Sequence, residues 1–206
     1  MALAIIIVLA LVFIGFYIQF CLAVAPPRKP AMHFLERGFA TALSAILLSM
    51  AGAIGLVNFY LRKSAGFVPA TYWLAMGIGL LLLALDEQMM IHEWIGLVFN
   101  SKGMEAPSLV KNWNDVIVIG YGVVGLAFCI IFYREILRYR AYLVLLVIGF
   151  SFYVLHTAID SLVVENTLQK IVTEEGAKIT CNMFLLLANA VYLHELVQPL
   201  RRLKAV

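Results

Sequence analysis

Residues 72–94 read YWLAMGIGLLLLALDEQMMIHEW, and the fold class can be predicted by starting from this segment. From Tyr72 to Leu85 no side chain is charged, as expected of a helix that crosses a lipid bilayer. Three carboxylates and a histidine then follow between Asp86 and Glu93, where that helix should leave the lipid. A charged group inside a membrane helix costs about 2.5–3.5 kcal/mol, so it needs a partner or a function. The stretch therefore predicts a transmembrane helix that ends in a polar site.

The composition extends this prediction to the whole chain. Of the 206 residues, 64% are hydrophobic and only 13% are charged, which excludes an ordinary soluble domain. The net charge of +3 comes from basic residues near predicted helix ends, so the sequence gives no sign of a nucleic-acid surface. We expect an all-α polytopic membrane protein, a single bundle of six transmembrane helices. The predicted spans cover about residues 2–25, 38–61, 69–91, 116–133, 141–164 and 176–198.

An even number of spans places both termini on one side of the membrane. The loops on that side are short and carry basic clusters at residues 62–63, 134–140 and 201–204. Short loops rich in lysine and arginine usually stay in the cytoplasm. The sequence therefore predicts cytoplasmic termini, in a bacterial inner membrane.

Most acids and histidines belong to the opposite, extracytoplasmic side of the predicted bundle. Three of the four histidines lie there: His33, His92 and His156. So do ten of the twelve carboxylates: Glu36, Asp86, Glu87, Glu93, Glu105, Asp115, Asp160, Glu165, Glu174 and Glu175. This asymmetry predicts one polar centre at the outer end of the bundle.

Helical spacing predicts which of these side chains share a face. The third helix is expected to continue beyond its span to Phe99. Asp86 and Glu93, seven residues apart, would then lie on one face, whereas Glu87 and His92 would point elsewhere.

The last two helices offer further stacked pairs. His156 and Asp160 are four residues apart on the fifth helix. On the sixth, Lys178 follows Glu174 by four residues and Glu175 by three, so it is the expected ion-pair partner of both.

Histidines grouped with several carboxylates are the ligands of metal centres in helical bundles. Oxygen and imidazole ligands suit iron, manganese or zinc, as a single divalent ion or a pair. We expect a metal-dependent membrane hydrolase or a di-metal oxidase or oxygenase acting on a lipid or another amphiphile. A haem held by two of the three outer histidines is a weaker alternative. The expected metal ligands are Asp86, Glu87, His92, Glu93, His156 and Asp160, with Glu174, Glu175 and Lys178 as catalytic candidates.

Each assignment has a structural alternative. The acids and histidines could form a polar network between helices, in a non-catalytic subunit of a larger membrane complex or of a homo-oligomer. Glu174 and Glu175 could occupy the first turn of a helix capped by Thr173, where acids favour the helix dipole. The aromatic residues near the span ends are expected in the membrane interface: Tyr72, Trp73, Trp94 and Trp113.

The pattern of Leu85-Asp86-Glu87 with His92-Glu93, followed by His156 and Asp160 and then by Glu174, Glu175 and Lys178, resembles uncharacterised bacterial multi-pass membrane proteins. This resemblance covers roughly residues 80–195 and implies no activity. The chain is also weakly similar to the alkaline ceramidase-like membrane metal hydrolases, which hold a His/Asp zinc site near one membrane face. It departs from them in having six predicted spans where seven are usual, and no His-x-x-x-His pair in its last helix.

Overall fold

The computed structural model describes residues 2–66, 70–107, 110–163, 165 and 167–203, and this part of the chain contains helices and no strands. The predicted all-α class is therefore confirmed. The elements, in order, are α1 (Ala2–Val24), the short 3-10 helix η1 (Met32–Phe34), α2 (Phe39–Ser64), α3 (Thr71–Met89), α4 (Ile91–Ser101), α5 (Trp113–Ile131), α6 (Tyr133–Ile136), α7 (Arg140–Leu162) and α8 (Leu168–Leu203).

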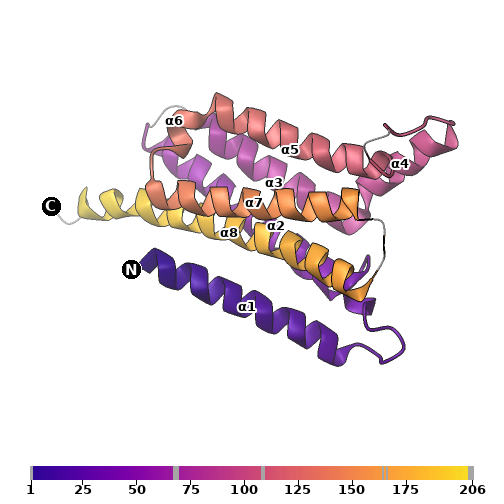
Figure 1. The fold of residues 1–206 in the computed structure, drawn as a ribbon. Helices are drawn as coiled ribbons and strands as arrows, with labels where there is room; N and C mark the ends of the chain where they lie inside the picture. Colours follow the sequence, from indigo (N-terminus) through magenta and orange to yellow (C-terminus); the bar gives the residue numbers. More distant parts are fainter. Residues whose placement is uncertain (1, 67–69, 108–109, 164, 166, 204–206) are drawn as a thin grey trace.

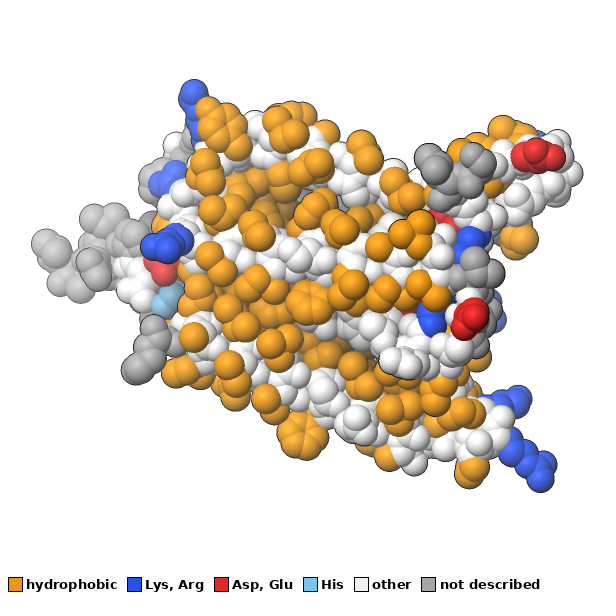
Figure 2. All heavy atoms as spheres, in the orientation of Figure 1, with side chains coloured by type: hydrophobic (Ala, Val, Ile, Leu, Met, Phe, Trp, Pro, Cys, Tyr) orange, Lys and Arg blue, Asp and Glu red, His pale blue; other side chains and the backbone are white. Residues whose placement is uncertain are grey.

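The described helices include five that are long and apolar enough to cross a membrane, or six if α3 and α4 are counted as one broken span. The start of α1 and the end of α8 lie at the same end of the bundle, and α4 leaves it at the other (Figure 1). Apolar side chains cover the flank between the two ends, and charged side chains gather at the ends themselves (Figure 2). This is the distribution expected of a bundle surrounded by lipid.

The centre of the bundle is formed by α2, α3, α7 and α8, which pack closely as the pairs α2–α3, α7–α8 and α2–α8. The first helix, α1, packs against α8, and α5 packs against α7 and α4. Glycines allow the close α2–α3 approach. A Cβ added to Gly77 would lie 2.8 Å from Cδ2 of Leu56 and 2.9 Å from its backbone nitrogen, so only glycine fits there.

This packing makes Gly77→Leu a destabilising change. A leucine side chain would push α2 and α3 apart, and we expect a loss of about 1–3 kcal/mol of unfolding free energy. Gly79→Leu is the matched control, because a Cβ at Gly79 meets nothing within 4 Å. Thermal unfolding of the two variants in the same detergent measures the difference. Equal melting temperatures would contradict the described packing of α2 on α3.

The third helix is shorter than predicted. It ends at Met89, and the chain turns by 64° at Met90 before α4 begins. Met90 has a left-handed backbone with φ of 57°, which interrupts a regular α-helix. The prediction of one continuous helix to Phe99 is therefore wrong, and so is the shared face of Asp86 and Glu93 that depended on it.

The last helix starts earlier than predicted, at Leu168. The backbone nitrogen of Lys170 donates to Oγ1 of Thr167, 3.2 Å away, so Thr167 caps the helix. Thr173 lies inside the helix, where its hydroxyl donates to the carbonyl of Gln169 at 2.7 Å. The predicted cap at Thr173 is therefore wrong. Glu174 and Glu175 do not lie in the first turn of α8, so the helix dipole does not explain their presence there.

A buried polar cluster closes the end of the bundle opposite α4. Glu135 of α6 accepts hydrogen bonds from Arg62 at 2.9 Å, from Nε1 of Trp73 at 3.2 Å, and from the hydroxyl of Tyr192. Arg62, Trp73 and Tyr192 are fully buried, as is Tyr72 beside them. Tyr72 and Trp73 are therefore core residues and not the predicted interface aromatics, because they pack around a buried ion pair.

Candidate functional site

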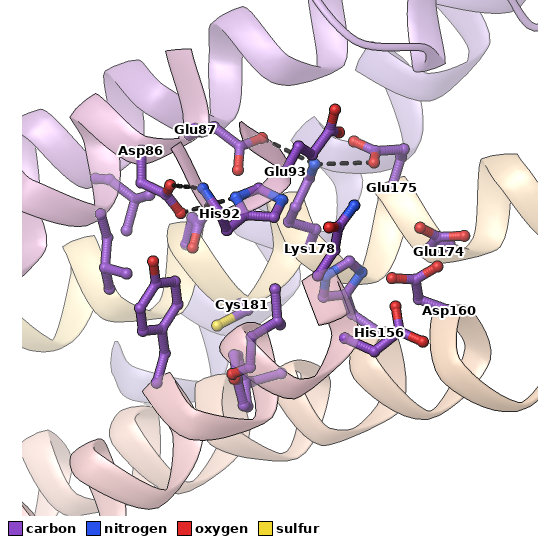
Figure 3. Close-up of a pocket in the computed structure, with 18 of the residues that line it drawn as sticks. Asp86, Glu87, His92, Glu93, His156, Asp160, Glu174, Glu175, Lys178 and Cys181 are labelled. Atoms are coloured by element: carbon purple, nitrogen blue, oxygen red, sulfur yellow. Dashed lines mark hydrogen bonds and ion pairs between the residues drawn. The ribbon is translucent and has the colours of Figure 1, made fainter. Parts of the chain in front are cut away.

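A polar cavity of about 270 Å³ lies at the end of the bundle where α3 bends into α4. Side chains from α3, α4, α5, α7 and α8 line it (Figure 3). The structure brings together all nine of the residues proposed from the sequence: Asp86, Glu87, His92, Glu93, His156, Asp160, Glu174, Glu175 and Lys178. Segments more than 80 residues apart along the chain thus contribute to one site.

The bend at Met90 positions two of these side chains. One carboxylate oxygen of Asp86 accepts a hydrogen bond from the backbone nitrogen of His92 at 2.7 Å, and the other lies 2.9 Å from the imidazole Nδ1. Asp86 therefore caps the start of α4 and orients the imidazole. A proton held on Nδ1 leaves Nε2 free to accept a proton or bind a metal. His92 thus lines the cavity, contrary to the prediction that it points away from the face of Asp86, because the chain bends at Met90.

Lys178 joins α8 to α3 across the cavity. Its ammonium lies 2.8 Å from Oε1 of Glu87 and 2.8 Å from Oε1 of Glu175 (Figure 3). The predicted pair with Glu175 is therefore present. Glu87, which was expected to point elsewhere, also faces the cavity. Glu175 is only 5% exposed, and its Oε2 has no hydrogen-bond partner among the residues that the structure describes.

Glu174 belongs to a second set of contacts at the wall of the cavity. Its partner is Lys170, at 2.5 Å, and not Lys178 as predicted. Lys170 also lies 3.6 Å from Oδ1 of Asp160. This pairing depends on the early start of α8, which places Lys170 one helical turn before Glu174.

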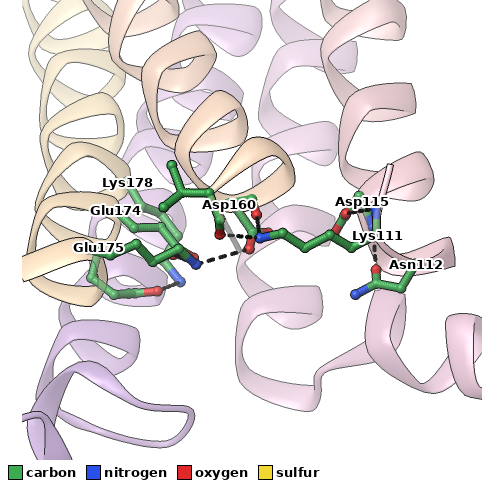
Figure 4. Close-up of polar contacts among 9 residues, drawn as sticks. Lys111, Asn112, Asp115, Asp160, Glu174, Glu175 and Lys178 are labelled. Carbon is green, nitrogen blue, oxygen red and sulfur yellow. Dashed lines mark hydrogen bonds and ion pairs between the residues drawn. The ribbon is translucent and has the colours of Figure 1, made fainter. Parts of the chain in front are cut away.

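Lys111, which precedes α5, ties this wall to the end of α7. Its ammonium donates to the backbone carbonyls of Asp160 and Val163, the latter at 2.5 Å (Figure 4). Its backbone nitrogen donates to the carboxylate of Asp115 at 3.0 Å. Asn112 caps α5 by accepting from the backbone nitrogen of Asp115 at 3.1 Å. The first turn of α5 is thereby fixed against α7.

His156 lines the cavity from α7, one turn before Asp160. Its Nδ1 is shielded from solvent and has no hydrogen-bond partner within the described residues. The hydroxyl oxygen of Ser161, on the same helix, is also shielded and has no hydrogen-bond partner among the described residues. A buried polar atom without a partner is costly, so such atoms mark places where a ligand or water can bind.

Several residues that line the cavity were not predicted from the sequence to belong to the site. Glu36 and Asp115 were predicted at the correct end of the bundle but not in the site. In all, eight of the ten acids predicted at that end line the cavity. The Asn-x-x-Asp spacing before α5 is a helix-cap signal that could have located Asp115. The other polar or sulfur-containing lining residues are Asn112, Asn114, Tyr121, Tyr153, Cys181 and Asn182.

Two further observations bear on a metal or a haem. Among the described residues, no three His, Cys, Asp or Glu side chains are arranged as a ready-made metal site. Ion binding therefore requires some of the present ion pairs to open. His33, the third outer histidine, stacks on Phe39 with ring centroids 4.1 Å apart and lies outside the cavity lining.

Comparison with known families matches residues 2–194 to one family model, described as a domain of unknown function, DUF8692. The chain belongs to the DUF8692 family. No curated protein and no solved structure matches it. The DUF8692 match includes every helix that lines the cavity, with only the end of α8 beyond it. The family description carries no activity, and no alkaline ceramidase-like protein is found among these matches.

Proposed function

We propose that the cavity binds a divalent metal ion, and that the loaded protein acts on the polar headgroup of an amphiphile. The observation that supports this most is the imbalance of charge in the cavity. Eight carboxylates line it, and Lys178 is the only lysine or arginine among its described lining residues. Lys170, outside the lining, pairs with two of the eight, Asp160 and Glu174, so the carboxylates still outnumber the cations. A cavity with this excess of negative charge, partly shielded from water, favours a cation of more than one charge.

The donor atoms present suit iron, manganese or zinc. His92, oriented through Asp86, offers Nε2, and His156 offers an unpartnered nitrogen from the facing helix. Further oxygen ligands would come from Glu87, Glu93 and Asp160, and from Glu175 once Lys178 has left it. A bound ion supplies a Lewis acid and an acidified water. Glu174 is then the candidate for accepting a proton, and Lys178, once released, for contacting an anionic part of the substrate.

The amphiphile is proposed from the position of the cavity. Its lining residues include His92 and Glu93 of α4, the helix that leaves the bundle at one end of the apolar flank, where lipid headgroups would be (Figures 1 and 2). Trp94 and Leu97 on α4 are 66% and 64% exposed, as expected of a helix lying in the membrane interface. We place this end outside the cytoplasm of a bacterium, with both termini inside. A C-terminal reporter that is active only in the cytoplasm tests this orientation.

A specific observation also favours the non-catalytic alternative. Asp86, Glu87, Asp160, Glu174 and Glu175 already have cationic or imidazole partners. These pairs connect α3 to α4, α3 to α8, and α7 to α8. Their whole role could therefore be to hold the helices together. In that case the protein would be a helical subunit that docks on a larger membrane complex.

Metal binding separates the two proposals. The protein is purified in mild detergent, freed of metal with a chelator, and titrated with Mn²⁺ and Zn²⁺ by calorimetry. We expect saturable binding of one or two ions per chain. Calorimetry that detects no saturable binding of either ion would reject the metal centre. Stoichiometric copurification of a partner protein would then support the docking subunit.

A further inference from the structure

We infer that Lys178 is a tethered cation that occupies the metal position and must leave before an ion can enter, so that it sets the affinity and the charge selectivity of the site. This inference rests on the proposed metal-binding function. It concerns the state of the cavity before the metal arrives.

The geometry around the ammonium is that of a bound cation. Carboxylates from two helices, Glu87 of α3 and Glu175 of α8, each lie 2.8 Å from Nζ of Lys178. Glu175 is buried, and its second carboxylate oxygen lacks a hydrogen-bond partner among the described residues. A buried carboxylate that stays ionised needs a cation beside it to offset the loss of water. Lys178 supplies that cation when no ion is present.

An incoming ion competes directly with this ammonium. A metal bound by Glu87 and Glu175 needs the same oxygens that accept from Lys178, so both cations cannot hold them together. The flexible lysine stem lets the ammonium move away without unfolding the helix. Lys178 thereby lowers the affinity of the site for every cation that uses these two acids.

The exchange also discriminates by charge. Replacing the ammonium by Na⁺ or K⁺ leaves the charge between Glu87 and Glu175 unchanged, so little is gained. Replacing it by a divalent ion adds one positive charge next to the other carboxylates of the cavity. The tethered lysine therefore excludes monovalent ions and admits divalent ones.

The test compares Lys178→Gln with the wild-type chain in Mn²⁺ titrations at low and high NaCl. Lys102→Gln is the matched control, because Lys102 is an exposed residue at the end of α4 and its loss removes the same charge. We expect K178Q to bind Mn²⁺ about tenfold more tightly or better, and NaCl to compete more strongly in K178Q than in the wild type. K102Q should behave as the wild type.

The possible outcomes separate this inference from the proposed function. Mn²⁺ binding to the wild type that is unchanged or weakened in K178Q overturns the inference and leaves the metal centre standing. Binding to K178Q alone supports the inference and overturns the metal centre in the natural chain. Binding to neither protein overturns both.

A second measurement uses only the wild-type chain, in case K178Q does not fold. Lysines are acetylated with acetic anhydride with and without Mn²⁺, and each site is quantified by mass spectrometry. We expect modification of Lys178 to rise when Mn²⁺ releases its ammonium from Glu87 and Glu175, while Lys102 stays constant. A constant or reduced modification of Lys178 in protein that has bound Mn²⁺ would overturn the inference.

Discussion

The double variant Asp86→Ala/His156→Ala is expected to lose metal binding, with an affinity at least about a hundredfold weaker than that of the wild type. The two changes act on different helices that line the cavity, α3 and α7. Removing Asp86 releases both the backbone nitrogen and Nδ1 of His92, so the imidazole is no longer held in one orientation. Removing His156 deletes a nitrogen that is shielded from solvent and has no partner among the described residues.

A matched control is available within the same chain. Glu105→Ala/His194→Ala also removes one acid and one histidine, from exposed positions outside the cavity lining. It should bind Mn²⁺ as the wild type does. Calorimetric titration gives the affinities, and circular dichroism shows whether each variant retains its helices. If the cavity variant folds and binds Mn²⁺ with unchanged affinity, Asp86 and His156 are not part of a metal site.

Glu135→Ala is expected to cause the largest loss of stability. The carboxylate of Glu135 lies in a buried cluster and accepts from Arg62, Trp73 and Tyr192, so its removal leaves a buried guanidinium without its carboxylate and two further donors without their acceptor. Breaking a buried pair in this way costs about 3–5 kcal/mol.

Thermal unfolding in detergent measures the effect, with Glu105→Ala as a control for the loss of an exposed carboxylate. The cavity proposed to bind metal lies at the other end of the bundle, so folded Glu135→Ala protein should bind Mn²⁺ as the wild type does if that proposal holds. A melting temperature equal to that of Glu105→Ala would show that Glu135 does not hold α6 against α2, α3 and α8.

Much of the architecture follows from the sequence because long apolar runs leave few other possibilities. The side on which the acids gather could also be predicted, since it depends only on the order of spans and loops. The convergence in one cavity of residues as distant in sequence as Asp86 and Glu175 follows from that order. The ion-pair partners of these residues cannot be predicted from that order, because they depend on where each helix begins and bends.

The break at Met90 shows why such details were missed. Neither glycine nor proline marks the position, and methionine is a good helix former, so local propensity favours a continuous helix. The turn is held by contacts of Asp86 with a residue six positions later, which helical periodicity does not suggest. A left-handed methionine is itself unfavourable. The contacts that α4 makes with Asp86 and α5 are what compensate for it.

The start of α8 illustrates a second kind of error. Thr167 and Thr173 are both plausible caps in the sequence, and the apolar run begins only after the second. The first turns of α8 are polar because Lys170 and Glu174 pair beside the cavity, not because they belong to a loop. Similarly, Tyr72 and Trp73 look like interface residues until Glu135, over 60 positions away, provides a buried partner for Trp73.

The most direct test of a metal centre between the helices is an anomalous difference map from crystals of the protein grown with Mn²⁺. We predict a peak inside the cavity, within ligand distance of His92 or His156 and of at least one carboxylate from α3, α4 or α7, with the ammonium of Lys178 displaced from Glu87 and Glu175. A cavity without a peak, in crystals whose Lys178 still bridges Glu87 and Glu175 at saturating Mn²⁺, would contradict the proposed function.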